Sequence, residues 1–156
     1  MTKYHLDEID LAILRSLSGN ARTPYLEIAR ECKVSGASIH QRVQRLTSLG
    51  IIQGTETRID SSSVGYDTCA YIGFFLHEPT KFSSVVEQLK QIPEVVECHF
   101  TTGKYDLFIK MYAKNNEHLL DLIHTKFLNF GTARTETLIS FRQLFHRSLP
   151  ISSQED

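Results

Sequence analysis

One segment of the chain places polar and basic side chains at a spacing suited to contact with DNA. Between Ser35 and Gly50 the sequence is SGASIHQRVQRLTSLG, in which Ile39, Val43 and Leu46 recur at helical spacing. A second stripe lies beside them on the same helix, formed by Ser38, Gln41, Arg42 and Arg45. Hydroxyl, amide and guanidinium groups can bond base edges in the major groove. The segment is therefore predicted to be a DNA-binding helix.

The ends of this helix are also predictable. The Ser35 hydroxyl can accept a backbone N–H of the first turn, and Gly50 can adopt the left-handed conformation that ends a helix. The residues expected to contact DNA are Ser35, Ser38, His40, Gln41, Arg42 and Arg45. For the two arginines we favour a DNA contact over a solvated surface charge. For the other polar side chains of the helix, contact and plain exposure stay open alternatives.

A second candidate site lies at a turn between two predicted strands. Thr102, Gly103 and Lys104 form the turn, and Tyr105 and Asp106 follow. The Asp106 carboxylate can receive an ammonium group through a charge-assisted bond, and a glycine lets the backbone approach a ligand closely. Alternatively, Gly103 is only a glycine that the hairpin turn requires, and Lys104 is only a solvated turn residue; both alternatives stay open.

Composition and charge restrict the remaining possibilities. The chain has 156 residues, 41% hydrophobic and 22% charged, with a net charge of −1. No acidic residue lies between Cys32 and Thr55, where Lys33, Arg42 and Arg45 are basic. A local basic surface on a near-neutral chain fits a DNA-binding module joined to a second module.

Other classes of function find little support in the sequence. The three cysteines are widely spaced, and the seven histidines show no metal-ligand spacing. Phosphate-loop and dinucleotide-loop patterns are absent, and no nucleophile–base pair stands out. We expect a cytoplasmic protein that is not an enzyme and has no metal, no cofactor and no membrane-spanning segment.

The DNA-binding helix is predicted to belong to a winged helix-turn-helix domain over residues 1–60. A first helix is expected over residues 6–18, and a second begins at Thr23-Pro24, with Thr23 as its cap. Short helices joined by a tight turn, the second basic, are typical of a helix-turn-helix. Residues 51–59 contain β-branched residues around Gly54, which predicts a small wing or connecting strand.

Residues 61–150 are predicted to form an α+β, ferredoxin-like βαββαβ sandwich. Strands are expected over residues 69–76, 96–101, 105–112 and 135–145, with one helix opened by Pro79 and another capped by Asn115 or Asn116. Apolar residues remain for the sheet face that the helices leave uncovered, which predicts at least a homodimer. Residues 151–156 are expected to be a disordered tail.

Three motifs in order resemble the Lrp/AsnC, or feast/famine, transcriptional regulators. They are LDEIDLAILRSL from Leu6, VSGASIHQRVQRLTSLGIIQG from Val34, and TTGKYDLFIKM from Thr101. The resemblance runs from Leu6 to about Leu149. It implies a winged helix-turn-helix followed by a ferredoxin-like sensing domain, dimers that assemble further, often into octamers, and an amino acid or related metabolite as effector.

The resemblance also implies the effector-binding residues. They are Thr102, Gly103, Lys104, Tyr105, Asp106, Thr135, Glu136 and Thr137. Family members frequently carry an acid at the position of Lys104 and an arginine at that of Glu136. These two departures favour an altered effector, and they keep open the alternative of an architectural DNA-organising protein with a vestigial effector site.

Overall fold

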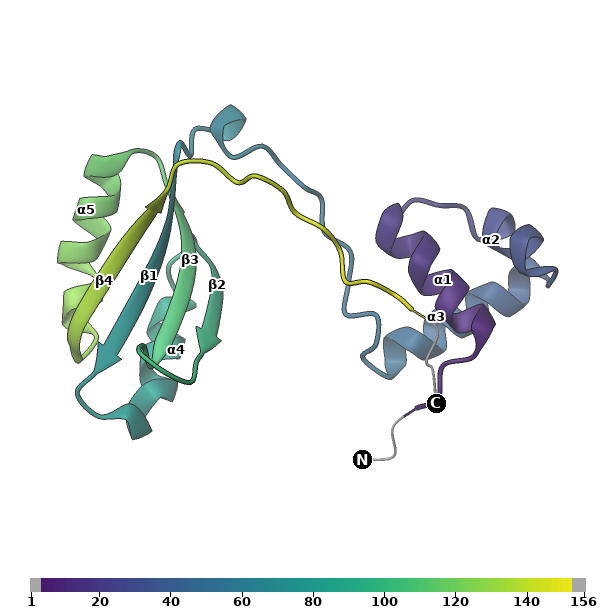
Figure 1. Ribbon diagram of the computed structural model, residues 1–156, viewed down its shortest axis with the longest axis horizontal. Helices are drawn as coiled ribbons and strands as arrows, with labels where there is room; N and C mark the ends of the chain where they lie inside the picture. Colours follow the sequence, from purple (N-terminus) through teal and green to yellow (C-terminus); the bar gives the residue numbers. More distant parts are fainter. Residues whose placement is uncertain (1–3, 153–156) are drawn as a thin grey trace. The chain divides into compact units, whose positions relative to one another are not determined.

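The computed structural model describes residues 4–152 and divides them into two compact units. The described part of one unit is residues 4–57 with 145–152, and the other unit is residues 58–144. The first is helical, and the second is built on a four-stranded sheet (Figure 1). No helix within residues 4–152 is long and apolar enough to cross a membrane.

The helical unit contains the predicted helix-turn-helix. Its helices are α1 (Glu8–Gly19), α2 (Tyr25–Cys32) and α3 (Gly36–Ser48). Lys33 ends α2 in the left-handed conformation, with φ of 56°, and thus makes the tight turn into α3. The apolar stripes of the three helices meet in one core, whose fully buried side chains are Ile13, Ile28, Ile39 and Leu46. Burial of these stripes holds the three short helices together.

The predicted ends of α3 are confirmed, while α1 and α2 each begin later than predicted. Ser35 caps α3, because its hydroxyl oxygen accepts the backbone N–H of Ser38 at 3.1 Å. Gly50 follows α3 with φ of +70°. Pro24, and not Thr23, is the N-cap of α2, since the Thr23 hydroxyl donates to the carbonyl of Asn20 at 2.8 Å instead.

The predicted wing at residues 51–59 is absent from the described chain. Ile51 and Ile52 still donate to the carbonyl of Leu46, but residues 53–60 form no strand and no backbone–backbone hydrogen bond within residues 4–152. A strand needs a neighbour to supply its ladder. The β-branched pattern therefore predicted a strand for which residues 4–152 supply no partner.

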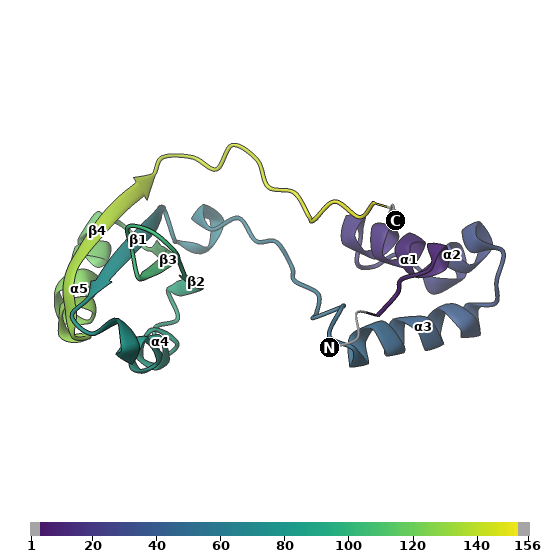
Figure 2. The ribbon, with the colours of Figure 1, turned by 60° about the horizontal axis from the view of Figure 1, so that its bottom comes forward.

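The second unit is the predicted ferredoxin-like sandwich. Its sheet has the order β2-β3-β1-β4 with every pair antiparallel, and α4 and α5 connect the strands (Figures 1 and 2). The elements are β1 (Thr68–Leu76), α4 (Phe82–Leu89), β2 (Val95–Phe100), β3 (Leu107–Ala113), α5 (Asn116–Thr125) and β4 (Thr132–Ser140). Short 3₁₀ turns cover Ser62–Val64, Pro79–Lys81 and Phe127–Asn129.

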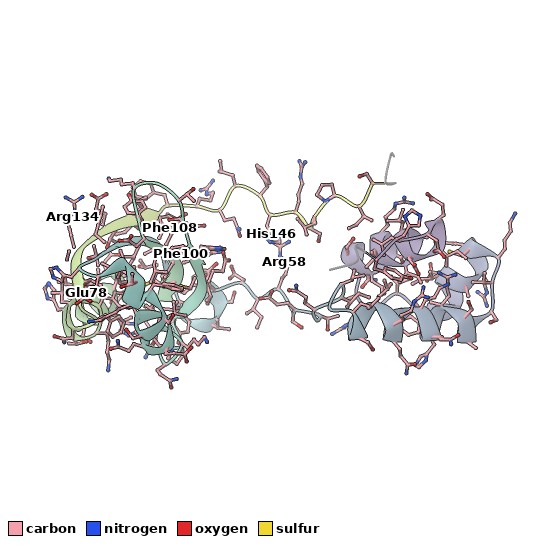
Figure 3. All side chains as sticks on the ribbon, turned by 90° about the horizontal axis from the view of Figure 1, so that it is seen from below. Arg58, Glu78, Phe100, Phe108, Arg134 and His146 are labelled. Atoms are coloured by element: carbon pink, nitrogen blue, oxygen red, sulfur yellow. The ribbon has the colours of Figure 1, made fainter. Side chains whose placement is uncertain are left out.

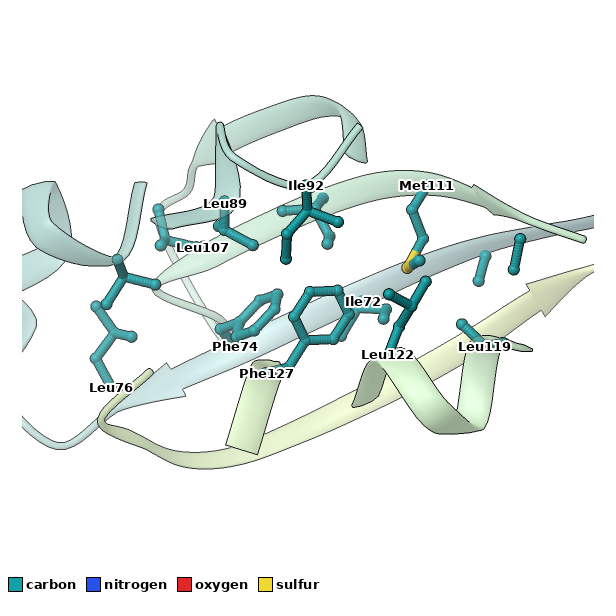
Figure 4. Packing of buried hydrophobic residues seen from close by; sticks show 14 residues of the cluster. Ile72, Phe74, Leu76, Leu89, Ile92, Leu107, Met111, Leu119, Leu122 and Phe127 are labelled. Carbon is teal, nitrogen blue, oxygen red and sulfur yellow. The ribbon is translucent and has the colours of Figure 1, made fainter. Parts of the chain in front are cut away.

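Both helices pack on one face of the sheet. Alternate residues of β1 and β3, such as Phe74 and Ile109, point to that side and are fully buried. Phe74 meets Phe127 edge to face, with ring centroids 5.5 Å apart (Figure 4). This single core fixes the strand order, and with it the set of side chains on the opposite face.

The face without helices, called the open face below, carries a run of aromatic rings. Tyr71 stacks on Phe108, Phe108 on Tyr105, and Tyr105 meets Phe75 edge to face, with centroids 5.3–5.8 Å apart. The run is possible because Gly73 lies beneath Tyr105. A Cβ at Gly73 would lie 2.3 Å from that ring.

The end of β4 differs from its predicted place. The last residue of the strand is Ser140, paired with Cys69, because β1 begins at Thr68 and offers nothing further to pair with. After β4 the chain leaves the sheet, and residues 145–152 group with the helical unit. There the Ser148 hydroxyl donates to the carbonyl of Ser18 at 3.0 Å. Of the predicted tail, 151–156, residues 153–156 lie outside the described residues.

Replacement of Gly73 by alanine should destabilise the second unit by about 1–3 kcal/mol, because the new Cβ displaces the Tyr105 ring. Urea denaturation would measure the loss. Gly19→Ala is the control, since a Cβ there meets nothing within 4 Å. Equal stability of the two variants would contradict this account of Gly73.

Candidate functional site

The predicted DNA-binding helix, α3, is held to α1 by a buried carboxylate. The side chain of Asp10 is 1% exposed, and Arg42 Nη1 lies 2.7 Å from its Oδ1. Arg45 Nη2 lies 3.5 Å from Oδ2, which also accepts the Tyr4 hydroxyl at 3.1 Å. A buried charge is tolerated when it is paired and hydrogen-bonded, as here. Asp10 therefore fixes the rotation of α3 about its own axis.

Asp7 extends this network at the start of α1. It caps the helix by accepting the backbone N–H of Asp10 at 2.8 Å, and it accepts Arg42 Nη1 at 2.7 Å. Partial burial opposes its charge, but the Asp10 amide and the Arg42 guanidinium outweigh burial and lower the pKa of Asp7. Hydrogen bonds to Asp7, then to Asp10, raise the pKa of Arg42. One guanidinium thus joins two carboxylates to α3.

The predicted DNA contact of Arg42 would compete with ion pairs inside the helical unit. Its guanidinium is engaged with Asp7 and Asp10, and its side chain is 22% exposed. The exposed side of α3 is rotated about the helix axis, by about a quarter of a turn, from the stripe that was predicted to contact DNA. The exposed residues of the helix centre on Ala37, His40, Gln41 and Gln44, with Arg45 at the edge. This set is called the α3 outer face below.

Gln44 was absent from the sequence prediction, although it follows Gln41 by three residues. The other predicted residues lie on or beside the α3 outer face. His40 and Gln41 are exposed, Ser38 is partly buried, and Ser35 serves as the cap. The ring of His40 meets Tyr25 of α2 edge to face at 6.0 Å. The outer face therefore presents amide and imidazole groups, with a guanidinium at its border.

The predicted effector residues are divided between two faces of the sheet. Glu136 pairs with Gly73 and lies on the open face, whereas Thr135 and Thr137 pair with Phe74 and Ile72 and point to the helix side. The two threonines therefore do not lie with Glu136. The residues that gather on the open face at this end are Lys104, Tyr105, Arg134 and Glu136.

Glu136 is the centre of that group. It accepts bonds from the Lys104 ammonium, from the Tyr105 hydroxyl at 3.0 Å and from Arg134 Nη2 at 2.7 Å (Arg134 is labelled in Figure 3). The Lys104 bond, then the Tyr105 bond, lower the pKa of Glu136, and Glu136 raises the pKa of Lys104. Arg134, which the prediction did not include, also lies 4.2 Å over the ring of Phe75.

Asp106 and Gly103 shape the turn that carries Lys104. The Asp106 carboxylate accepts the backbone N–H of Leu76 at 2.8 Å, and its own N–H donates to the carbonyl of Phe74 at 2.9 Å. Gly103 has φ of +113°, a conformation that side chains disfavour. Thr102 is exposed at the turn. Asp106 thus fastens the turn to the end of β1, a role that the sequence prediction did not assign.

The charges of this group suit the two ends of a small zwitterion. The Glu136 carboxylate can accept an ammonium, and the Lys104 ammonium or the Arg134 guanidinium can donate to a carboxylate. Within residues 4–152, no three His, Cys, Asp or Glu side chains are placed to hold a metal ion.

Both units match known domain families. Residues 6–47 match the AsnC-type helix-turn-helix domain, and residues 69–150 match the Lrp/AsnC ligand binding domain. The chain is 37% identical to Regulatory protein AsnC of Haemophilus influenzae over 147 residues, which are 94% of this chain and 98% of that protein. It is 34% identical to the Escherichia coli K12 protein of the same name, over 96% of this chain and 99% of that one.

Solved structures agree with these matches. The structure of E. coli AsnC superposes with a TM-score of 0.86 at 34% identity, over 94% of this chain and 99% of that one. A feast or famine regulatory protein from M. tuberculosis, complexed with L-methionine, superposes with a TM-score of 0.88 at 25% identity, over 95% of this chain and 100% of that one.

Replacement of Arg42 by methionine should destabilise the helical unit by about 3 kcal/mol, because it leaves the buried Asp10 carboxylate without its main partner. Urea denaturation would measure the loss, with Gln44→Met on the exposed side of α3 as the matched control. The added change Asp10→Asn should restore part of the loss. An Arg42→Met variant as stable as the control would show that the pair does not hold α3.

Proposed function

This chain belongs to the Lrp/AsnC family of DNA-binding transcriptional regulators, and from that premise we propose how it binds DNA and responds to an effector. The α3 outer face enters the major groove, with Gln41 and Gln44 toward base edges. Arg42 positions the helix through Asp10. The protein acts in the cytoplasm as an assembly of identical subunits.

The observation that carries the DNA proposal is the division of polar groups around α3. One side is bound to α1 by Arg42, and the opposite side presents two exposed glutamines and His40. A glutamine amide offers a donor and an acceptor together, which is the pattern that matches the major-groove edge of adenine. Arg45 lies at the edge of this face, 49% exposed, and suits a phosphate.

The effector proposal rests on the charged group around Glu136. An amino acid would place its ammonium on Glu136 and its carboxylate on Lys104 or Arg134. That a relative was solved with L-methionine supports an amino-acid effector. The tyrosine hydroxyl that holds Glu136 belongs to the open-face aromatic run, so a ligand there would act on the same surface that joins subunits.

The assembly proposal rests on the open face itself. An aromatic surface left without helices favours burial against a second copy, which makes a homodimer. Such dimers would assemble further, into an octamer. With a net charge of −1, a single copy should bind DNA weakly. An effector that favours one assembly over another would thereby change how many DNA-binding helices are presented and at what spacing.

An architectural DNA-organising role is the second candidate, and one observation favours it. Lys104 and Glu136 neutralise each other without any ligand, so the predicted effector site is already satisfied. Under this alternative the assembly would wrap DNA in the same way with or without an amino acid.

The double change Gln41→Ala, Gln44→Ala should weaken binding to the preferred DNA sequence at least tenfold, while affinity for random DNA changes little, because amide contacts to bases supply discrimination of about 1–3 kcal/mol each. Fluorescence anisotropy at fixed salt would measure both, on DNA selected from a random pool by the unaltered protein. Gln88→Ala, Gln91→Ala, at and just after the end of α4, is the matched control. Equal effects of the two double changes would refute the assignment.

At least one of the twenty amino acids should raise the midpoint of thermal unfolding, because a ligand that binds only the folded state stabilises it, by about 2.7 kcal/mol at a hundredfold excess over its dissociation constant. Glu136→Gln should abolish the rise. Glu87→Gln, which disturbs the exposed Glu87–Lys90 pair on α4, should leave it intact. No rise with any amino acid, together with ligand-independent DNA wrapping, would favour the architectural role.

A further inference from the structure

The segment that follows β4 is extended and lacks any backbone partner. This segment, residues 141–149, is called the arm below. Within residues 4–152 its amides and carbonyls make no backbone–backbone hydrogen bond. It is drawn as an extended trace beyond the β4 arrow in Figures 1 and 2, and Figure 3 labels His146 within it. Unpaired extended backbone is a template for pairing with another chain.

The arm is also apolar. Four of its nine residues have large hydrophobic side chains, all of them 74–103% exposed: Phe141, Leu144, Phe145 and Leu149. Contiguous exposed hydrophobic side chains on a folded protein usually mark a contact surface. Two aromatic rings among the four are the side chains that interfaces use most as anchors.

Both ends of the arm are held. Ser140 is paired with Cys69 in the sheet, and beyond the arm the carbonyl of Ile151 accepts Arg15 Nε at 3.2 Å. Near its end the Ser148 hydroxyl donates to the carbonyl of Ser18. These bonds attach the chain on either side of the arm, while the four large apolar side chains of the arm are exposed.

A second copy of this chain is the partner that fits. β4 carries Leu138 on the open face, 55% exposed, and runs directly into the arm, so a subunit contact on the open face continues onto it. In a two-fold contact the same segment of both chains can meet near the axis, and each can supply the backbone partner that the other lacks. DNA could bind the basic side chains of the arm, Arg142 and Arg147, but it would leave the apolar side chains exposed.

We propose that residues 141–149 form an inter-subunit arm, whose apolar side chains are covered by a second copy of this chain. The inference rests on the proposed homodimer and adds a contact to it. The arm continues from β4, which carries Glu136, and ends on residues bonded to α1. Its burial would therefore restrain the DNA-binding units of the two subunits.

Hydrogen exchange of the arm amides in the full-length protein tests this directly. Above the concentration at which the protein dimerises, exchange at residues 141–149 should slow at least tenfold, and below it exchange should be fast. Fast exchange in a proven dimer would overturn the arm while leaving the dimer intact. Slow exchange of the arm amides at every concentration would show that the same chain covers the arm. Slow exchange only after addition of DNA would show that DNA covers it. Either result would overturn the proposed partner. Absence of any dimer would overturn both proposals.

A pair of variants provides the second test. Phe141→Ser, Phe145→Ser should raise the dissociation constant of the dimer at least tenfold in sedimentation measurements, with an unchanged circular dichroism spectrum. Leu120→Ser, Leu128→Ser removes two exposed apolar side chains outside the arm, 53% and 54% exposed, and should change the constant less than about threefold. An equal effect of the two pairs would overturn the proposal.

Discussion

The proposed mode of DNA binding depends on one buried carboxylate. Asp10 is held at the interface between α1 and α3, and Arg42 must face it, because an unpaired charge there is costly. That pairing decides the rotation of α3, and therefore which of its side chains are exposed. The two glutamines become the exposed groups because they lie on the side of the helix turned away from Asp10. In the proposed mode of binding, stability and recognition thus use opposite sides of one helix.

In the second unit, Gly73 is the position on which the open face depends. The absent side chain leaves room for Tyr105, whose ring joins the aromatic run and whose hydroxyl holds Glu136. The contact surface and the charged group are consequently parts of one surface. A ligand that competes for Glu136 would disturb Tyr105 and the aromatic rings stacked on it, which gives a physical route from effector to assembly. The arm follows directly in the chain from β4, the strand that carries Glu136.

Local features of the chain could be predicted from sequence, and features that depend on a distant partner could not. The Ser35 cap and the Gly50 end were predictable because caps involve neighbouring residues. The rotation of α3 was not, since Arg42 faces Asp10 32 residues away. The predictions of a wing and of a longer β4 were wrong. β-branched residues over 51–59, and alternation beyond Ser140, continue where the described residues supply no neighbouring strand to pair with. The separation of Glu136 from its neighbouring threonines followed from strand alternation and was available from sequence.

The most direct test of the central claim is a structure of the full-length protein bound to its preferred DNA. The account predicts Gln41 and Gln44 against base edges in the major groove, with Arg42 still paired to Asp10 of the same subunit. An Arg42 side chain released from Asp10 and bound to a base or phosphate, with the glutamines facing solvent, would contradict it.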